Sequence, residues 1–390
     1  QFKLLKIGQK AINPYENVGK TCCVEMRNAV KERLLQVLAS HLHTVHEAFQ
    51  ALDHTSPSSL ERASWVDVVK MGDHLYKQAT IVGMLWTGED PNLKTVEENM
   101  ESFFNSLRCL LLLAHQSSVG AGPTLSSCIY CSMKQIVDSS SKLMMDTVSS
   151  YGSHDKDIKI TVPQLVGAIW EACSGLKKTP ATNVTAIGRA LTKIAISVKD
   201  VLREMQELKL EDTSKQPDEN VDDAFRNVAI VCHDDDNSSN DGDFGNDLSP
   251  EEMRVAQAAI GVVSEVIALL KELIRTILST YQEEKLVEDC RCLDSLESLL
   301  RICREISEQI DELGACLYPP QEVSTMMAAL KKISNTIMEI SELTKSLGSS
   351  SDLSPVLDRL NTKVKSMEFE LRCPSISDLQ ADIQTIKLNN

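Results

Sequence analysis

Apolar residues recur at alternating intervals of three and four positions in several stretches of this chain. This spacing puts them on one face of an α-helix, and that face must be covered by other helices. The first stretch runs through Ile260, Val263, Ile267, Leu270, Ile274 and Ile277. A second runs through Leu296, Leu299, Cys303, Ile306, Ile310 and Leu313, and a third through Trp65, Val68, Gly72, Leu75, Ala79, Val82 and Trp86. Because each run ends at a turn signal after about three heptads, the pattern favours antiparallel bundles over one long coiled coil.

Turn signals and prolines divide the rest of the chain into similar elements. In the first half the pattern predicts helices at about 26–52, 58–86, 92–117, 123–149, 163–175 and 181–210. In the second half it predicts helices at about 250–283, 287–316, 321–347, 353–371 and 376–387. Ser249-Pro250-Glu251-Glu252 has the form of a capping box, with Ser at the N-cap, Pro at the first helical position and Glu three residues after the cap.

Composition supports an all-α fold. The 390 residues include only 16 Gly and 12 Pro, and aromatic residues make up 4%. Few glycines and prolines mean few turns and long elements, and an aromatic content this low is unusual for a sandwich or barrel. We therefore expect two antiparallel helical bundles, because a chain of this length can build two cores.

Residues 211–248 differ from their surroundings, because Asp, Glu, Asn and Ser crowd this stretch. Such a sequence buries too little apolar surface to offset its conformational entropy, so it is expected to be a disordered acidic linker. The predicted organisation is an unstructured extension at 1–25, a helical bundle at 26–210, the linker at 211–248 and a second bundle at 249–390. Met26 is the expected initiator, because regular periodicity begins there.

The heptad rows of the second bundle are candidate partner-binding surfaces, because an amphipathic helix can offer its apolar face to another protein. The candidate residues are Ile260, Val263, Ile267, Leu270, Leu296, Leu299 and Ile306. The same rows could equally form the core of the C-terminal bundle. If the closed bundle buries them, pairing with a partner requires local opening.

No pattern in the sequence indicates catalysis, and neither a cofactor nor a metal is expected. His41, His43 and His46 form the densest histidine group, but no His-Glu-x-x-His or paired Cys-x-x-Cys pattern supplies further ligands. Cys128 and Cys131 form a lone Cys-x-x-Cys without the βαβ context of a redox site. The twelve cysteines are expected to be reduced thiols in the cytosol or nucleus.

Two serines are candidate phosphorylation sites. Ser238 has Asp241 three residues later in an acidic stretch, which suits an acid-directed kinase. Ser249 precedes Pro250 and so fits a proline-directed kinase, although its place as a helix cap already explains the residue.

The charge of the chain argues against nucleic acid as a direct partner. The net charge is −16, so the mean field repels phosphates. The apolar run from Cys109 to Ala114 is far shorter than the roughly 20 residues of a membrane span, so no membrane association is expected.

Several segments resemble the cyclin-D-binding protein family, also called the cyclin-D-interacting protein (GCIP) family, and its plant members in particular. Besides the acidic linker, they are Ser40-His41-Leu42-His43-Thr44-Val45-His46, Ile169-Trp170-Glu171-Ala172-Cys173, the helix from Asn183 through Leu191-Thr192-Lys193 to Glu204-Met205, and Leu313-Gly314-Ala315-Cys316-Leu317-Tyr318-Pro319-Pro320. The order of these segments carries the resemblance, which covers most of residues 26–390.

The resemblance implies a two-domain helical protein of nucleus and cytoplasm that regulates the cell cycle and transcription. Family members bind D-type cyclins, and they pair with helix-loop-helix transcription factors without a basic region that reads DNA. The sequence departs from one family feature, because Arg301-Ile302-Cys303-Arg304-Glu305 has Arg where a Leu-x-Cys-x-Glu motif needs Leu. Arg108-Cys109-Leu110 has the Arg-x-Leu form of a cyclin-docking motif, on a face expected to be buried.

These observations favour a non-enzymatic regulatory binding protein. The alternative is a cytoskeletal or adhesion scaffold of the vinculin and catenin type, which also strings helical bundles together. Binding to actin would support the scaffold, and capture of cyclins or helix-loop-helix factors would support the regulator.

Overall fold

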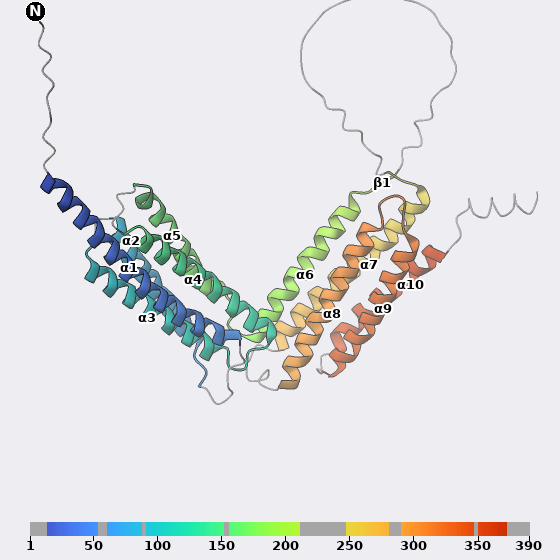
Figure 1. Cartoon of the computed structure of the whole chain (residues 1–390). Helices are drawn as coiled ribbons and strands as arrows, with labels where there is room; N and C mark the ends of the chain where they lie inside the picture. Colours follow the sequence, from blue (N-terminus) through green and yellow to red (C-terminus); the bar gives the residue numbers. More distant parts are fainter. Residues whose placement is uncertain are drawn as a thin grey trace, which may run out of the picture. The chain divides into compact units, whose positions relative to one another are not determined.

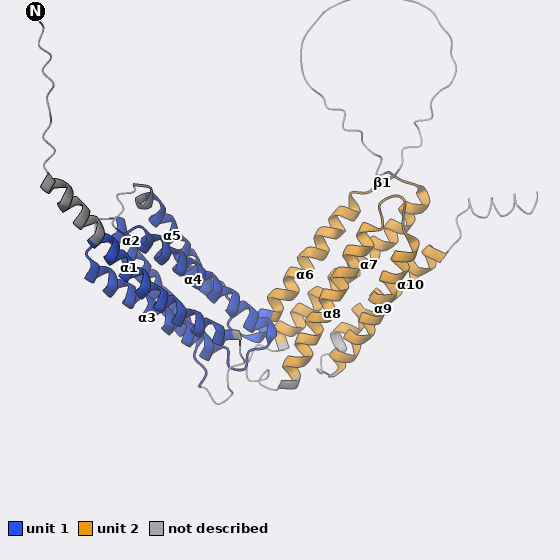
Figure 2. Ribbon diagram, viewed as in Figure 1, with its two compact units in different colours: residues 1–186 blue, residues 187–390 orange. Residues whose placement is uncertain are grey.

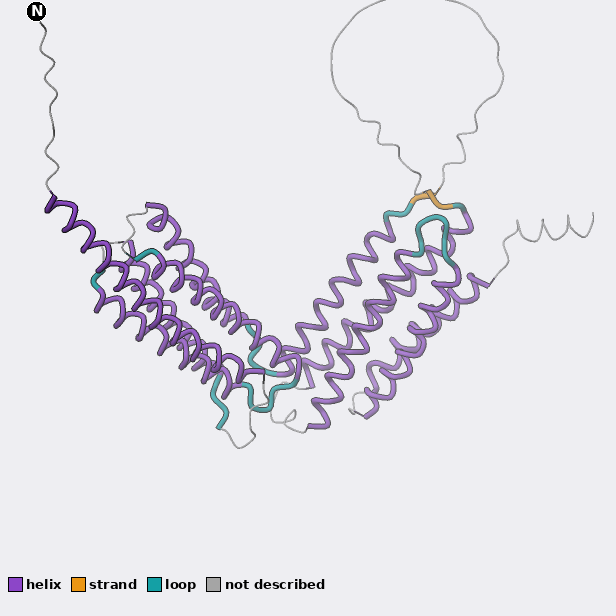
Figure 3. The backbone as a smooth tube through the Cα atoms, viewed as in Figure 1, coloured by secondary structure: helices purple, strands orange, loops and turns teal. Residues whose placement is uncertain are grey.

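A computed structural model describes residues 14–53, 61–87, 91–151, 156–210, 247–280, 290–346 and 350–372. Within these ranges the chain is almost entirely α-helical, as the sequence predicts (Figure 3). The described residues form two compact units, residues 1–186 and 187–390 (Figure 2). The predicted linker at 211–248 lies outside the described residues except for Asp247 and Leu248, and the helix predicted at 376–387 lies outside them as well.

The first unit is a bundle of five long helices, labelled in Figure 1. They are α1 (Pro14–Gln50), α2 (Trp65–Thr87), α3 (Leu93–Ser117), α4 (Pro123–Ser149) and α5 (Lys156–Gly175). Short 3-10 turns, η1 (Ala51–Asp53) and η2 (Leu176–Lys178), follow α1 and α5. Helix α1 packs on α3 and α4, and α2 packs on α3 and α5. Together with the packing of α4 on α5, these contacts build one core.

Aromatic side chains fill much of this first core. Phe103 and Phe104 are fully buried and meet edge-on at 5.8 Å between ring centres. Tyr76 of α2 stacks on Trp170 of α5 at 5.1 Å, and the Trp170 indole N–H donates to Thr80 Oγ1 at 3.1 Å. The part-buried Trp170 indole N–H thus has an acceptor beside its apolar contacts, which lowers the cost of burying it.

The second unit contains α6 (Asn183–Gln206), α7 (Pro250–Thr280), α8 (Cys290–Ala315), α9 (Val323–Ser346) and α10 (Ser350–Arg372). Helix α7 packs mainly on α10, α8 on α9, and α9 also on α10. The core is aliphatic, and it includes Val266, Leu300, Ile333 and Leu360, all fully buried.

A pair of two-residue parallel strands closes one end of this unit. Strand β1 (Lys209–Leu210) follows α6, and β2 (Asp247–Leu248) precedes α7. Lys209 pairs with Asp247 and Leu210 with Leu248. The end of α6 is therefore fastened to the start of α7, and we call this strand pair the clasp.

The structure places the C-terminal boundary of the first bundle earlier in the chain than the sequence predicts. The division between the units falls inside α6, whereas the predicted first bundle ends at residue 210. The reason is that α6 turns its apolar seam toward the helices of the second unit. A side-chain carbon added at Gly188 would lie 3.2 Å from Leu278 of α7, and one at Gly314 of α8 would lie 2.9 Å from Val201 of α6.

Two predicted helix starts also differ from the structure. Helix α1 begins at Pro14, inside the extension predicted at 1–25 to be unstructured, because proline is well tolerated at the first helical position. Helix α5 begins at Lys156 and continues through Pro163, where a start was predicted. Val162 and Val166 on either side are buried, so packing offsets the hydrogen bond that the proline removes.

Candidate partner-binding groove

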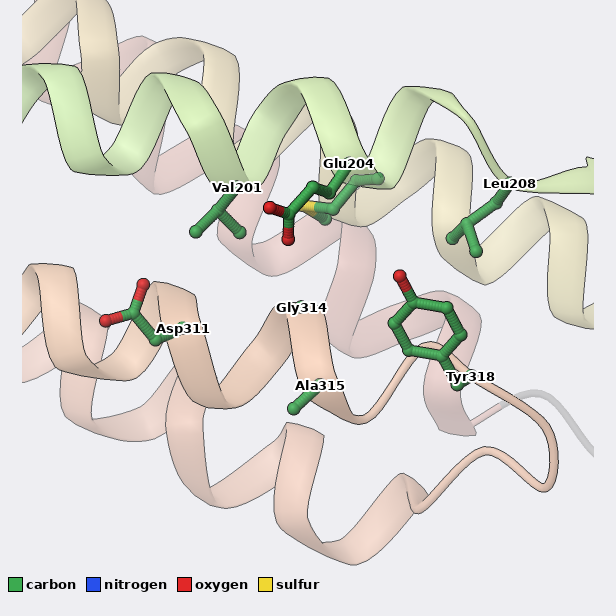
Figure 4. Close-up of a pocket in the computed structure, with 8 residues that line it drawn as sticks. Val201, Glu204, Leu208, Asp311, Gly314, Ala315 and Tyr318 are labelled. Carbon is green, nitrogen blue, oxygen red and sulfur yellow. The ribbon is translucent and has the colours of Figure 1, made fainter. Parts of the chain in front are cut away.

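A candidate site lies between the C-terminal halves of α6 and α8, within the second unit. It is a groove of about 320 Å³. We call it the α6–α8 groove, and it is lined by Val201, Glu204, Met205, Leu208, Asp311, Gly314, Ala315 and Tyr318 (Figure 4). Its position follows from two small residues, Gly314 and Ala315, which leave room on α8 for the facing side chains of α6.

The floor of the groove is apolar, and two carboxylates lie at its edge. Met205 is buried at 3% exposure, while Glu204 and Asp311 are exposed. Their side chains extend from opposite helices into the gap between α6 and α8 (Figure 4). Burial and the nearby carboxylates of Glu308 and Glu204 raise the pKa of Asp311 above its ordinary value. The groove therefore concentrates negative charge beside apolar surface.

Hydrogen bonds hold the loop that carries Tyr318 at the end of α8. The Gln321 side-chain amide donates to the carbonyl oxygens of Leu317 and Glu252, each at 3.1 Å. Leu317 is fully buried, whereas Tyr318 is 42% exposed. The Tyr318 ring thus stands at the mouth of the groove on an anchored loop.

The candidate partner residues predicted from the heptads lie in the core. Val263, Leu270, Leu296, Leu299 and Ile306 are at most 1% exposed. Ile267 is 7% exposed, and only Ile260 is half-buried. The rows therefore form the packing surface of the closed unit. Binding through them stays a prediction, and it requires the local opening anticipated from the sequence.

The Arg-x-Leu segment in α3 is also closed. Leu110 is fully buried, and Arg108 donates to Thr44 Oγ1 of α1 at 3.5 Å. A partner that needs both side chains cannot reach them in the folded first unit.

The capping box at the start of α7 forms as predicted. The Glu252 backbone N–H donates to Ser249 Oγ at 3.2 Å, and the Ser249 N–H donates to Glu252 Oε2 at 3.0 Å. These two bonds satisfy donors that a helix start leaves unpaired. Phosphorylation of Ser249 stays a prediction. Ser238 lies outside the described residues.

The histidines of α1 take part in separate local contacts. His41 stacks on Phe104 at 5.0 Å, and burial together with Arg108 lowers its pKa. His43 lies 3.4 Å from Glu47, and His46 shares a hydrogen bond of 2.9 Å with Gln50. In the described part of the chain, no three metal-ligating side chains come together.

The cysteines with described side chains are free thiols, including Cys128 and Cys131 of the Cys-x-x-Cys pair. Burial raises the pKa of Cys303 to about 12, and burial with the charge of Asp73 raises that of Cys173 to about 12. A thiol with so high a pKa stays protonated and unreactive at neutral pH. Both residues act as small apolar groups in the cores.

Helix α7 is long and apolar enough to cross a membrane by length and composition, with a mean hydropathy of 1.7 over the qualifying window. The sequence prediction of no membrane association did not single it out. In the structure 44% of that window is buried, and α7 packs against α10. The buried residues of α7, Val263 and Leu270 among them, belong to the core of the second unit.

Sequence reasoning did not identify the α6–α8 groove. Its walls come from segments far apart in the chain, and only their approach creates the gap. A signal was present in the small pair Gly314-Ala315, which precedes Tyr318 and two prolines at a helix end. The spacing of apolar residues, by contrast, points to the core and not to the surface.

Comparison with known proteins places both halves of the chain in one family. Residues 67–211 match the N-terminal domain described as Grap2 and cyclin-D-interacting, and residues 233–342 match the C-terminal domain of the same description. A relative named "Cyclin-D1-binding protein 1 homolog", from Xenopus laevis, is 23% identical over 180 residues. That match covers 46% of this chain and spans about half of the relative, 49% of its length. Since the two domain matches cover more than half of the chain in the expected order, the chain belongs to the Grap2 and cyclin-D-interacting family.

Proposed function

We propose that this chain is a non-enzymatic regulator that binds D-type cyclins, helix-loop-helix transcription factors, or both, through helical surfaces. The match to both domains of the Grap2 and cyclin-D-interacting family carries the proposal. The named relative, a homologue of a cyclin-D1-binding protein, points to the cyclin as the first partner to test. Such partners would be met in the nucleus and the cytoplasm.

The described structure suits a protein that works by contact. Its two units are helical bundles with closed cores, and the second unit offers a groove with apolar and charged walls. Exposed helix faces and grooves between helices are common docking surfaces for helical segments of other proteins. No basic stretch precedes the α7–α8 pair in the sequence, so pairing with a helix-loop-helix factor would not add a DNA contact.

The test is direct binding between purified components. The full chain is immobilised and exposed in turn to a D-type cyclin, a helix-loop-helix domain, an A-type cyclin as a control for cyclin class, and filamentous actin. We expect saturable binding of the D-type cyclin or the helix-loop-helix domain, with the A-type cyclin bound at least about tenfold more weakly. Binding of actin alone would instead support the vinculin-type scaffold, and binding of neither regulator would refute the proposal.

A further inference from the structure

We propose that the α6–α8 groove docks a helical segment of a partner protein whose apolar ridge is flanked by lysine or arginine. The inference rests on the proposed function, because it names the kind of partner segment that the second unit receives. It goes further by placing the contact away from the heptad rows, which are buried. The groove is open in the folded unit, so docking there needs no opening of the core.

The shape of the groove suits the side chains of a helix. Val201 of α6 and Leu208, just after α6, extend toward α8, and Ala315 on the facing wall is too small to fill the space (Figure 4). A volume of about 320 Å³ accepts a few large apolar side chains and not a whole domain. Each apolar side chain of the partner that moves from water into the groove favours binding, because its apolar surface is buried.

The carboxylates of the groove favour basic residues on either side of the partner helix's apolar ridge. Glu204 and Asp311 form no ion pair within the described residues, and Arg203, next to Glu204, pairs with Asp200 at 3.5 Å instead. Glu308 adds a third carboxylate near Asp311. A lysine or arginine of the partner would replace this repulsion by attraction, and it would reject acidic segments.

Tyr318 supplies an aromatic face at the end of the groove away from Asp311 (Figure 4). Its side chain lies across from Leu208, with the hydroxyl directed toward α6 (Figure 4). An exposed ring in an acidic groove favours a cationic side chain of the partner, which can lie over the ring face. Tyrosine is also among the residues that most often anchor protein interfaces.

The walls of the groove are fixed before any partner arrives. The clasp fastens the end of α6 to the start of α7, and Gln321 ties the loop of Tyr318 to Glu252 near the same place. A preformed site avoids the entropy cost of ordering loops on binding. A second copy of this chain is a poor occupant, because its net charge of −16 would add to the repulsion.

Two variants of the full chain test the groove. Glu204→Gln with Asp311→Asn removes both carboxylates, and Ala315→Leu fills the space from an exposed position. The matched control is Glu342→Gln with Asp358→Asn, which changes the charge equally at exposed sites on α9 and α10. Circular dichroism and thermal unfolding establish that each variant folds like the wild type.

The probe is a helical peptide of about 18 residues, with leucines on one face and lysines at its edges. A second peptide carries glutamate in place of each lysine. We expect the full chain to bind the lysine peptide and not the glutamate peptide. Affinity should fall about tenfold or more in the carboxylate variant and in Ala315→Leu, while the control stays within about twofold. Equal binding by all variants, or no binding by the wild type, would overturn the proposal.

The same variants separate this inference from the proposed function. A D-type cyclin or a helix-loop-helix domain is titrated against the wild type and against both groove variants. If the wild type binds either regulator and the groove variants bind equally well, the regulatory function stands and the groove is not its site. If the wild type binds neither regulator but binds the lysine peptide with the expected losses, the groove proposal stands and the proposed function fails.

Discussion

The two units use their aromatic residues in opposite ways. In the first unit the rings meet one another inside the bundle, as Tyr76 and Trp170 do, and Phe103 is fully buried. Among the described residues of the second unit, the two aromatic side chains are Tyr318 and Phe369, exposed at 42% and 67%. The described part of the second core is built from aliphatic side chains together with Met and Cys, without a buried ring. Both units are helical bundles, but the first buries its aromatic rings in the core and the second exposes the two that are described.

The largest expected effect separates a buried ring from an exposed one. Phe103→Ala leaves a cavity in the first core and should lower the free energy of unfolding of that unit by about 3–5 kcal/mol. Phe369→Ala removes a ring that is 67% exposed and should change stability by less than about 0.5 kcal/mol. All three tryptophans lie in the first unit, so tryptophan fluorescence follows that unit and far-ultraviolet circular dichroism follows both. Comparable losses in the two variants would break the comparison.

Two helix glycines should sharpen the contrast in packing. A side-chain carbon at Gly72 of α2 would lie 2.4 Å from Leu176, so Gly72→Ala should destabilise the first unit by about 1–3 kcal/mol. At Gly261 of α7 the nearest atom, on the Lys363 side chain, would be 3.6 Å away. Gly261→Ala should therefore stabilise the second unit by up to about 1 kcal/mol through helix propensity. Denaturant titrations followed by tryptophan fluorescence and by circular dichroism measure the change in unfolding free energy of each variant. A stabilising Gly72→Ala would be inconsistent with close packing at Gly72.

The smallest expected effect concerns the edge of the α6–α8 groove. Since the folded state raises the pKa of Asp311 above 3.8, the folded protein holds this proton more tightly than the unfolded chain does. The contribution of Asp311 to stability therefore falls as pH rises through 3.8 and then through the raised pKa, so the ionised form is mildly destabilising at neutral pH. Asp311→Asn should raise the unfolding midpoint at pH 7 by less than about 2 °C, because Asp311 is exposed and solvent screens its charge.

Thermal scans of the wild type and Asp311→Asn at several pH values test this sign. The advantage of the variant should shrink as the pH is lowered through the raised pKa and below 3.8, because the wild-type carboxyl is then protonated in both states. A variant that is less stable than the wild type at neutral pH would show that Asp311 has a favourable partner.

Local patterns predicted most of the helices, because spacing and capping act between near neighbours. Helix α4 spans Pro123–Ser149 as the pattern indicates, and the capping box at Ser249 forms with both hydrogen bonds. The continuation of α5 through Pro163 was missed, because packing of the neighbouring valines decides it. The same limit applies to α6, whose spacing predicts a helix but does not name the helices that it packs on.

The α6–α8 groove could not be predicted from the sequence for a related reason. Periodicity identifies which face of a helix is apolar. It does not tell whether a row such as Val263 and Leu270 packs in the core or binds a partner. Glu204 and Asp311 are unremarkable surface carboxylates in the sequence, and their repulsion arises only because α6 and α8 approach near Gly314. The family resemblance came from the order of segments along the chain, which local physics does not encode.

The clasp makes residues 211–246 an insertion whose two ends meet at one place. The entropy of closing a loop grows only slowly with its length, so residues can be added or deleted between these ends at little cost to the helices. A shortened chain with a brief glycine-serine connector should still hold α6 against α8. The acidic segment can therefore gain or lose charge and kinase targets over evolutionary time without moving the helices on either side of it.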